Sequence, residues 1–238
     1  MLELRADNAG IVEVSALADL PLALARVGLR GSRPVLVVVG GADGLDPVIA
    51  RRLLSLFRDR LAPVLEGLGA LVIDGGTDAG VMAMVGQARR QSGAGFPLLG
   101  VAARGTVQRP GQPRGRGVPL EPNHTQLILV PGADWGDEVP WIAAAASAAA
   151  GSRGSATLVA GGGRITDRDI AASLSARRPT LPLMGSGGSA DAAAAGPMRH
   201  PLLRPIAETD DWLALDALLP SLLGRGRAAD VENGVGGT

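Results

Sequence analysis

The sequence predicts an α/β protein built on a doubly wound, mostly parallel sheet of about six or seven strands. Six short apolar runs recur along the 238 residues, and each is continuous rather than alternating with polar residues. Continuous runs are typical of strands buried on both faces, as in a parallel sheet. Stretches with helical periodicity lie between the runs, and this strand–helix repeat is the pattern of a doubly wound fold.

The expected strands are residues 35–39, 70–73, 98–102, 127–130, 157–160 and 181–184. The last run contains Pro182, which has no N–H for the ladder, so we expect it at a sheet edge or a strand start. Residues 11–29 are expected to add a strand and a helix before the first run.

The expected helices are residues 48–68, 78–91, 138–150, 167–176, 190–195 and 211–223. Pro63 should kink or end the first of them, because proline removes a backbone hydrogen bond. The Gly-, Pro- and Arg-rich segment 104–122 is expected to be a lid, a binding loop or disordered. We expect residues 1–223 to form a single domain and residues 224–238 a disordered tail.

The composition excludes several chemistries. There is no Cys, and all 23 basic residues are Arg, balanced by 23 acidic residues. Without Lys there is no Gly-Lys-Ser/Thr phosphate loop and no Schiff base, and without Cys there is no thiolate nucleophile or Cys-bound zinc. The two histidines, His124 and His200, lie far apart in the sequence. The sequence therefore predicts neither a metal site nor a cofactor.

The sequence also limits the partners. A net charge of zero gives no general attraction for nucleic acid, and 2% aromatic residues argue against a base-stacking platform. Residues 1–15 carry charges without an apolar stretch, and the longest Ala-rich run is too short to cross a bilayer. We expect a soluble, cytoplasmic protein that binds neither nucleic acid nor a membrane. The apolar C-terminal helix is compatible with the formation of a homo-oligomer.

Glycine-rich turns follow four of the six apolar runs, at residues 40–47, 74–80, 161–167 and 185–191. In an open parallel sheet these turns gather at the carboxyl edge, where ligands bind. Glycine lets backbone N–H groups approach an anion closely, and the following helix N-termini add a positive dipole. We therefore expect a site for a phosphate or pyrophosphate that needs no Lys.

Each turn also has a purely structural explanation. Glycine after a strand is often only a tight turn. Asp46 fits the N-cap of one helix, and Thr77 or Asp78 fits that of another. Thr166 with Asp169 fits a capping box. Four such turns at one edge nevertheless favour a ligand site over the structural explanation.

The spacing of Gly185, Gly187 and Ala190 matches a dinucleotide-binding pattern. It follows the last strand, however, and no acidic residue on a later strand is available to bind a ribose, so a standard NAD dehydrogenase is not expected.

A few side chains are candidates for chemistry. Arg164 lies in the third glycine-rich turn and Arg104 directly follows the third strand, and a guanidinium suits bidentate phosphate binding. Each also fits a solvent-exposed position. His124 is either a ligand contact or general base, or a residue satisfied within a turn or the core. The candidate acids are Asp74, Asp78, Asp137, Glu138, Asp167 and Asp169. No catalytic spacing stands out among them, so the sequence points to binding more firmly than to turnover.

Five segments in unbroken order resemble a known family. They read LVIDGGTDAGVMAMVGQA, LLGVAARGTV, LEPNHTQLILV, TLVAGGGRITDRDIAASL and LPLMGSGGSADA. Together they resemble the SLOG domain of the LSDAT type, and more narrowly the prokaryotic relatives of the N-terminal cytoplasmic region of melastatin-type TRP (TRPM) channels. The resemblance covers about residues 35–195.

The resemblance implies a Rossmann-like domain that binds or senses a nucleotide-derived ligand such as ADP-ribose, cyclic ADP-ribose or a related adenine nucleotide. It places the ligand contacts in the glycine-rich turns and in an Asn-His pair. With Arg104 and Thr166 added, the candidate ligand-binding residues are Gly40, Gly41, Gly75, Gly76, Thr77, Gly80, Arg104, Asn123, His124, Gly161, Gly162, Gly163, Arg164, Thr166, Gly185, Ser186, Gly187 and Gly188.

A more distant resemblance is to the LOG (lysine-decarboxylase-like) enzymes, which release a base from a nucleotide monophosphate. Their Pro-Gly-Gly-x-Gly-Thr turn is followed by a Glu, whereas the matching place here begins at Ala160 and has Asp167 and Asp169 as the nearest acids. A nucleotide N-glycosidase (phosphoribohydrolase) with Asp169 or Asp167 as its acid is therefore the alternative to a binding protein. A third hypothesis is a scaffold whose glycine turns are only structural.

Overall fold

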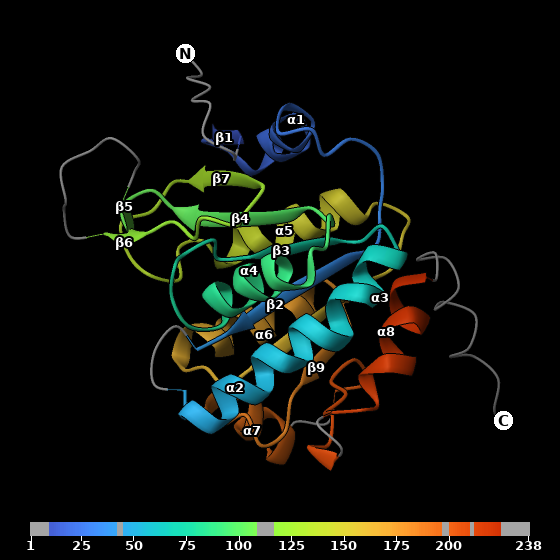
Figure 1. Ribbon diagram of the computed structural model, residues 1–238. Coiled ribbons are helices and arrows are strands. Elements are labelled where there is room, and N and C mark those ends of the chain that lie inside the picture. Colours follow the sequence, from blue (N-terminus) through green and yellow to red (C-terminus); the bar gives the residue numbers. More distant parts are fainter. Residues whose placement is uncertain (1–9, 42–44, 109–116, 197–199, 210–211, 225–238) are drawn as a thin grey trace, which may run out of the picture.

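A seven-stranded parallel sheet forms the centre of the protein (Figure 1). The computed structural model describes residues 10–41, 45–108, 117–196, 200–209 and 212–224. The strand order is β1-β7-β4-β3-β2-β8-β9, and each neighbouring pair is parallel. The doubly wound α/β prediction is thus confirmed.

The strands of this sheet are β1 (Gly10–Glu13), β2 (Val35–Gly40), β3 (Leu71–Asp74), β4 (Leu98–Ala103), β7 (Gln126–Val130), β8 (Ser155–Ala160) and β9 (Thr180–Pro182). All six apolar runs and the additional N-terminal strand are present. Pro182 lies in the edge strand β9, as expected.

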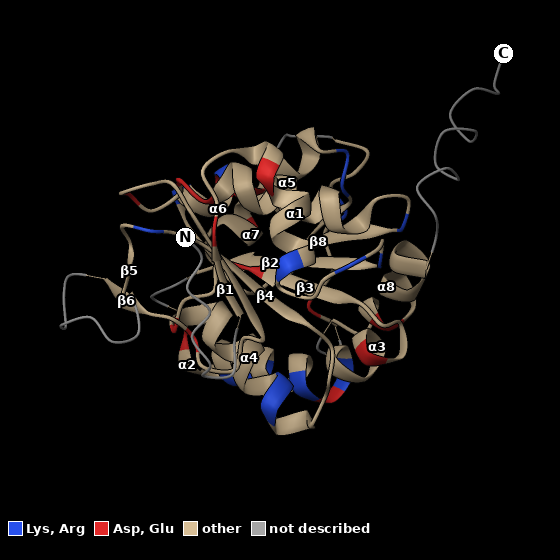
Figure 2. Ribbon diagram, turned by 90° about the horizontal axis from the view of Figure 1, so that it is seen from above, with Lys and Arg blue, Asp and Glu red and all other residues tan. Residues whose placement is uncertain are grey.

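Helices cover both faces of the sheet. One face carries α2 (Pro47–Ser55), η2 (Leu56–Leu61), α3 (Ala62–Gly67), α4 (Gly80–Ser92) and α8 (Leu215–Gly224). The other carries α1 (Leu20–Arg26), preceded by the short turn η1 (Leu17–Asp19), then α5 (Val139–Ala150), α6 (Arg164–Ser175) and α7 (Gly188–Ala195). Figure 2 shows the acidic and basic residues mainly on the outer helices and in loops, with the strands almost free of them.

The central strand β2 shows why the apolar runs are continuous. Leu36 and Val38 belong to the core on one face, whereas Val35, Val37 and Val39 belong to the core on the other. Because both faces are covered by helices, alternate residues on the two sides must all be apolar.

Pro63 does not end its helix, which was one of the two outcomes expected for it. The helix continues from α2 through η2 into α3, and η2 is a wider π-type turn in which the Ala62 N–H donates to the Phe57 carbonyl. A wider turn just before the proline accommodates its ring and its missing N–H within one continuous helical run.

Two of the expected helix caps are wrong. Helix α4 begins at Gly80 after Ala79, and α6 begins at Arg164 after Gly163, and neither N-cap residue offers a side-chain acceptor. Asp46 does cap α2, accepting from the N–H groups of Val48 at 2.7 Å and Ile49 at 3.2 Å. The side chains of Thr77 and Thr166 are therefore not used as caps.

The order of strands creates a topological switch point beside β2. From β2 the chain moves to β3 and β4 on one side, and after β7 it returns to β8 on the opposite side of β2. Turns after adjacent strands diverge at such a point and leave a crevice at the carboxyl edge.

Two sequence predictions fall partly or wholly outside the described residues. The segment 104–122 contains the paired strands β5 (Val107–Gln108) and β6 (Val118–Pro119), but residues 109–116 lie outside the description. The predicted tail lies outside it beyond Gly224. Among the described residues, no helix is long and apolar enough to cross a membrane.

Candidate functional site

A pocket of about 410 Å³ lies at the switch point, at the carboxyl ends of β2, β3, β4 and β8. This volume is in the usual range for a small-molecule site. Its wall includes eight of the residues predicted from the sequence: Gly40, Gly41, Gly75, Thr77, Gly162, Gly163, Arg164 and Thr166. This cavity therefore lies at the predicted edge of the sheet.

The turn between β8 and α6 supplies the unused backbone donors of this pocket. Helix α6 starts at Arg164, and its N-cap Gly163 has no side chain to accept from the first turn. Within the described chain, no acceptor is found for the N–H groups of Gly163 and Arg164. Unpaired N–H groups at the positive end of a 12-residue helix favour an anion there.

The other glycine-rich turns use many of their N–H groups inside the protein. Gly41 donates to the Ala160 carbonyl at 3.1 Å, and Gly76 donates to Asp74 Oδ1 at 2.7 Å. Gly185 and Gly187 donate to the two carboxylate oxygens of Asp191, at 2.6 and 3.1 Å. Asp191 thus occupies the place that an external anion would take in the last turn.

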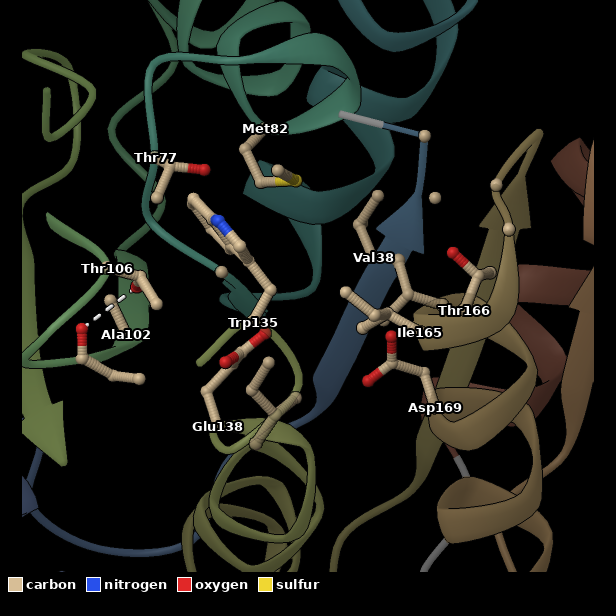
Figure 3. A pocket seen from close by; sticks show the side chains of 18 of the residues that line it. Val38, Thr77, Met82, Ala102, Thr106, Trp135, Glu138, Ile165, Thr166 and Asp169 are labelled. Carbon is tan, nitrogen blue, oxygen red and sulfur yellow. Dashed lines mark hydrogen bonds between the residues drawn. The ribbon is translucent and has the colours of Figure 1, made fainter. Parts of the chain in front are cut away.

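Trp135 forms another side of the pocket, from the loop between β7 and α5. Figure 3 shows its indole ring near Thr77 and Met82 at the mouth of the cavity. The side chain is 43% exposed although it is large and apolar. A partly exposed indole over a cavity is a suitable surface for stacking a planar ring.

Thr77 presents an unpaired polar group to the pocket. The residue is 1% exposed, and its hydroxyl has no hydrogen-bond partner among the described residues. By contrast, Thr106, also in the wall, donates its hydroxyl hydrogen to the Ala103 carbonyl at 3.0 Å. A buried hydroxyl without a partner costs free energy, so the Thr77 hydroxyl is a candidate for contact with a ligand.

Two carboxyl groups, Glu138 and Asp169, complete the wall. In Figure 3 Glu138 comes from the start of α5 and Asp169 from α6, and both are turned towards the space between the helices. Burial, and then the Glu138 carboxylate, raise the pKa of Asp169 to about 8 against an opposing effect of Arg168. Burial also raises the pKa of Glu138.

His124 lies next to the turn after β3 but outside the pocket wall. Its Nε2 is 2.8 Å from Asp74 Oδ1 and its Nδ1 is 2.8 Å from Glu121 Oε2, and the ring is buried. Burial lowers the pKa of His124, but the charges and hydrogen bonds of Asp74 and Glu121 outweigh it and raise the pKa to about 9. The imidazole is therefore a cation held between two carboxylates.

This buried cluster fixes the turn that carries Thr77. Asp74 also accepts from Gly76, whose φ is +67° and whose added Cβ would lie 2.8 Å from the Cα of Gly100. Glu121 in turn donates its N–H to the Gly76 carbonyl at 3.0 Å. Asn123, beside His124, donates its N–H to Glu121 at 2.8 Å.

A second hollow of about 340 Å³ lies on the other side of the β8–α6 turn. It contains the predicted residues Gly161, Gly162, Gly185, Ser186, Gly187 and Gly188. Gly162 borders both cavities. The remaining predicted residues, which line neither cavity, are Gly76, Gly80, Arg104, Asn123 and His124. Arg104 pairs instead with Glu13 of β1, at 3.1 Å.

Sequence reasoning missed Trp135 and gave Glu138 no defined role. Both lie in the turn after the fourth apolar run, PGADWGDE, which has fewer glycines than the four turns singled out. The rule that applies to the other turns applies here too, because this turn also follows the carboxyl end of a parallel strand. Position after a strand was thus a better signal than glycine content.

The comparisons with known proteins agree with this architecture. A family model described as "SLOG in TRPM, prokaryote" matches residues 33–219. The chain belongs to this family. The SLOG chain is also 30% identical over 135 residues to transient receptor potential cation channel subfamily M member-like 2 of Nematostella vectensis. That match covers 47% of the SLOG chain but 9% of the channel protein, so the chain spans a small part of this relative.

Two solved structures share the fold. The X-ray structure of TM1055, a structural-genomics target, superposes with a TM-score of 0.53 at 19% identity, covering 78% of the SLOG chain and 98% of the other. The molybdenum cofactor carrier protein of Chlamydomonas reinhardtii gives a TM-score of 0.51 at 17% identity, covering 79% and 99%. At these identities the likeness establishes a common α/β fold and leaves the ligand to be argued from the site.

Proposed function

We propose that this protein binds a nucleotide-derived ligand, such as ADP-ribose, a cyclic ADP-ribose or a related adenine nucleotide, in the pocket at the switch point. The observation that carries the proposal is the joint presence of a helix start with unpaired N–H groups and an unpaired, buried Thr77 hydroxyl in one cavity. Membership of the SLOG family supports the same class of ligand.

The arrangement of groups suits the three parts of a nucleotide. The start of α6, with Arg164 beside it, suits a phosphate or pyrophosphate. Trp135 suits stacking of the base. The other polar groups of the wall, Thr77 and the two carboxyls, suit the hydroxyl groups of a ribose. We propose that the ligand lies with its phosphates towards Gly163 and its base towards Trp135.

A thermal-shift and calorimetry screen tests this function. ADP-ribose, cyclic ADP-ribose isomers, NAD, AMP and adenosine are each titrated into the intact protein. A ligand at one hundred times its Kd is expected to stabilise the fold by about 2.7 kcal/mol. Phosphate-free adenosine should bind more weakly than AMP, because it leaves the α6 start empty.

Matched variants localise the site. Arg164→Pro removes an unpaired N–H group at the first helical position, where proline fits, together with the guanidinium, and should weaken binding of phosphorylated ligands. Trp135→Ala should weaken binding of adenosine and ADP-ribose alike. Arg90→Ala, on an exposed part of α4 outside both cavities, is the control. If none of the nucleotides shifts the unfolding temperature, a scaffold role is favoured instead.

A second candidate function is N-glycosidic bond hydrolysis. The observation in its favour is that Glu138 and Asp169 both line the pocket with raised pKa values, as acid–base catalysis requires. Asp167 is exposed and outside the wall, so Asp169 is the acid in this candidate function. Chromatography of bound AMP or ADP-ribose after overnight incubation decides between the two: intact ligand supports binding, and free base supports hydrolysis.

We further propose a cytoplasmic location and a small molecule as the principal partner, without nucleic acid or membrane binding. The family's relation to the TRPM channels supports this proposal. Light scattering with and without ADP-ribose tests whether the protein forms a homo-oligomer.

A further inference from the structure

The two pocket carboxyls stand out because no cation is in contact with them. Among the described residues, neither Glu138 nor Asp169 forms a salt bridge, and the carboxyl group of Asp169 has no hydrogen-bond partner although the residue is 8% exposed. Glu138 does accept from the Gly136 N–H, which is 3.0 Å from both of its oxygens. The two groups therefore differ: Glu138 accepts a hydrogen bond from the protein, whereas the Asp169 carboxyl accepts none from the described residues.

The surroundings of Asp169 offer little to stabilise a negative charge. Helix α6 packs against β2, β8 and β9, and these strands carry no ionisable side chain. Helices α5 and α7 also pack against α6. Glu138, the N-cap residue of α5, brings a like charge towards Asp169. Asp191 of α7 accepts hydrogen bonds from the N–H groups of Gly185 and Gly187. The cation that lowers the pKa of Asp169 is the exposed Arg168 on the same helix. Arg164, also exposed, lines the same pocket and forms no salt bridge with Asp169 among the described residues.

Two like charges in a mostly apolar cavity are unfavourable, so one of the groups keeps its proton. Asp169 is that group, since its pKa of about 8 leaves it neutral at pH 7. Hydrogen bonds from Gly136 favour the charged form of Glu138 relative to Asp169.

We propose that Asp169 is a specificity-determining residue that, as a neutral carboxyl group, donates a hydrogen bond to the ligand while Glu138 accepts one from it. The inference rests on the function proposed above, because it concerns the same pocket. A ligand group between them must therefore be both acceptor and donor. A ribose hydroxyl meets this requirement, whereas a phosphate has only acceptors and is repelled by Glu138.

The first test needs no ligand. Unfolding temperatures of wild type and Asp169→Asn are measured from pH 5 to pH 9.5, with Asp167→Asn, an exposed aspartate on the same helix, as the control. The neutral carboxyl resembles an amide, so the two proteins would match only below about pH 4, where the aspartate is protonated in the unfolded chain as well; at pH 5 the difference should still be small. Asp169→Asn should become progressively more stable than wild type up to about pH 8, and Asp167→Asn should not. A constant difference across the range overturns the proposal.

The second test measures ADP-ribose binding by calorimetry at pH 7 and pH 9. The apparent Kd of the wild type should rise about tenfold at pH 9, because only about a tenth of the molecules then keep the proton on Asp169. Asp169→Asn should show no such rise, and Asp167→Asn should behave as wild type. Glu138→Gln should move the onset of the rise to lower pH, because it removes the like charge that holds the proton on Asp169.

The outcomes separate the two proposals. Wild-type binding that is independent of pH, or a rise that persists in Asp169→Asn, overturns the role of Asp169 alone. Failure of ADP-ribose and the other nucleotides to bind at every pH overturns the proposed function, and the role of Asp169 towards a ligand with it.

Discussion

At the scale of single residues, Thr77 and Thr106 are two threonines in one pocket wall with different surroundings. The Thr106 hydroxyl is satisfied by the Ala103 carbonyl, whereas the Thr77 hydroxyl has no partner in the described structure. A polar group that is buried but unpaired reduces stability unless something else binds to it. The pair therefore allows a ligand contact to be distinguished from a structural hydrogen bond.

We predict opposite results for Thr77→Val and Thr106→Val. Thr77→Val should leave the free energy of unfolding unchanged or raise it slightly, because no hydrogen bond is lost. It should weaken nucleotide binding by about 1 kcal/mol, the usual value of one hydrogen bond. Thr106→Val should lower the unfolding free energy by about 1 kcal/mol. Urea unfolding and calorimetry measure both quantities, and a clear loss of stability in Thr77→Val would contradict the assignment.

At the scale of elements, helix α4 illustrates how the loop before β7 is held. Gly86 lies in the middle of α4 and is buried, and a Cβ added there would come within 2.2 Å of the Glu121 carboxyl group. Glycine in a helix interior costs about 1 kcal/mol relative to alanine. The missing side chain of Gly86 leaves room for the Glu121 carboxylate, which pairs with His124.

Gly86→Ala should therefore be destabilising by about 1–3 kcal/mol despite the better helix propensity of alanine. The matched control is Gly67→Ala at the exposed end of α3, where an added Cβ meets nothing within 4 Å. That change should stabilise the protein by up to about 1 kcal/mol. Guanidinium unfolding of both variants checks the prediction, and equal effects would show that Glu121 moves aside freely.

The strands and the capped start of α2 were predictable from sequence, but the starts of α4 and α6 were not. A run such as residues 35–39 is apolar throughout because both faces of β2 are buried, and the sequence alone shows this continuous pattern. Helices α4 and α6 begin instead at Gly80 and Arg164 without a capping side chain, so the expected Ser/Thr/Asp signal misplaces them. The cap is missing where the N–H groups of α6 face the pocket, so the error coincides with the candidate site.

The charged cluster below the site was beyond sequence reasoning for a different reason. Asp74 and His124 are 50 residues apart, and His124 precedes its strand, which suggests the opposite end of the sheet. Strand β3 is short, however, and Asp74 pairs with Gly100, which in turn pairs with Leu127 near the start of β7. The carboxyl end of β3 thus lies level with the beginning of β7. The register of β3, β4 and β7 therefore brings Asp74 and His124 into contact.

For the whole molecule, this cluster makes stability depend on pH. The pKa of His124 is raised to about 9 in the folded protein from 6.5. A cation whose folded pKa is raised contributes stability that is fully present below pH 6.5 and is lost as the pH rises through 9. At 1.36 kcal/mol per unit, the loss is about 3 kcal/mol. The raised pKa of Asp169 also makes the folded protein less stable as the pH rises, in this case between about pH 4 and 8.

His124→Gln separates the two contributions. At pH 6 it should lower the unfolding free energy by about 3–5 kcal/mol, because it leaves the carboxylates of Asp74 and Glu121 buried without their cation. The difference from wild type should shrink towards pH 9.5, where the wild-type imidazole also loses its charge. His200→Gln removes the other imidazole, which lies outside this cluster, and is the control. Urea unfolding at pH 6, 7.5 and 9.5 measures the difference. A deficit that stays constant over this range would mean that His124 is neutral when folded, and that hydrogen bonds alone hold the turn carrying Thr77.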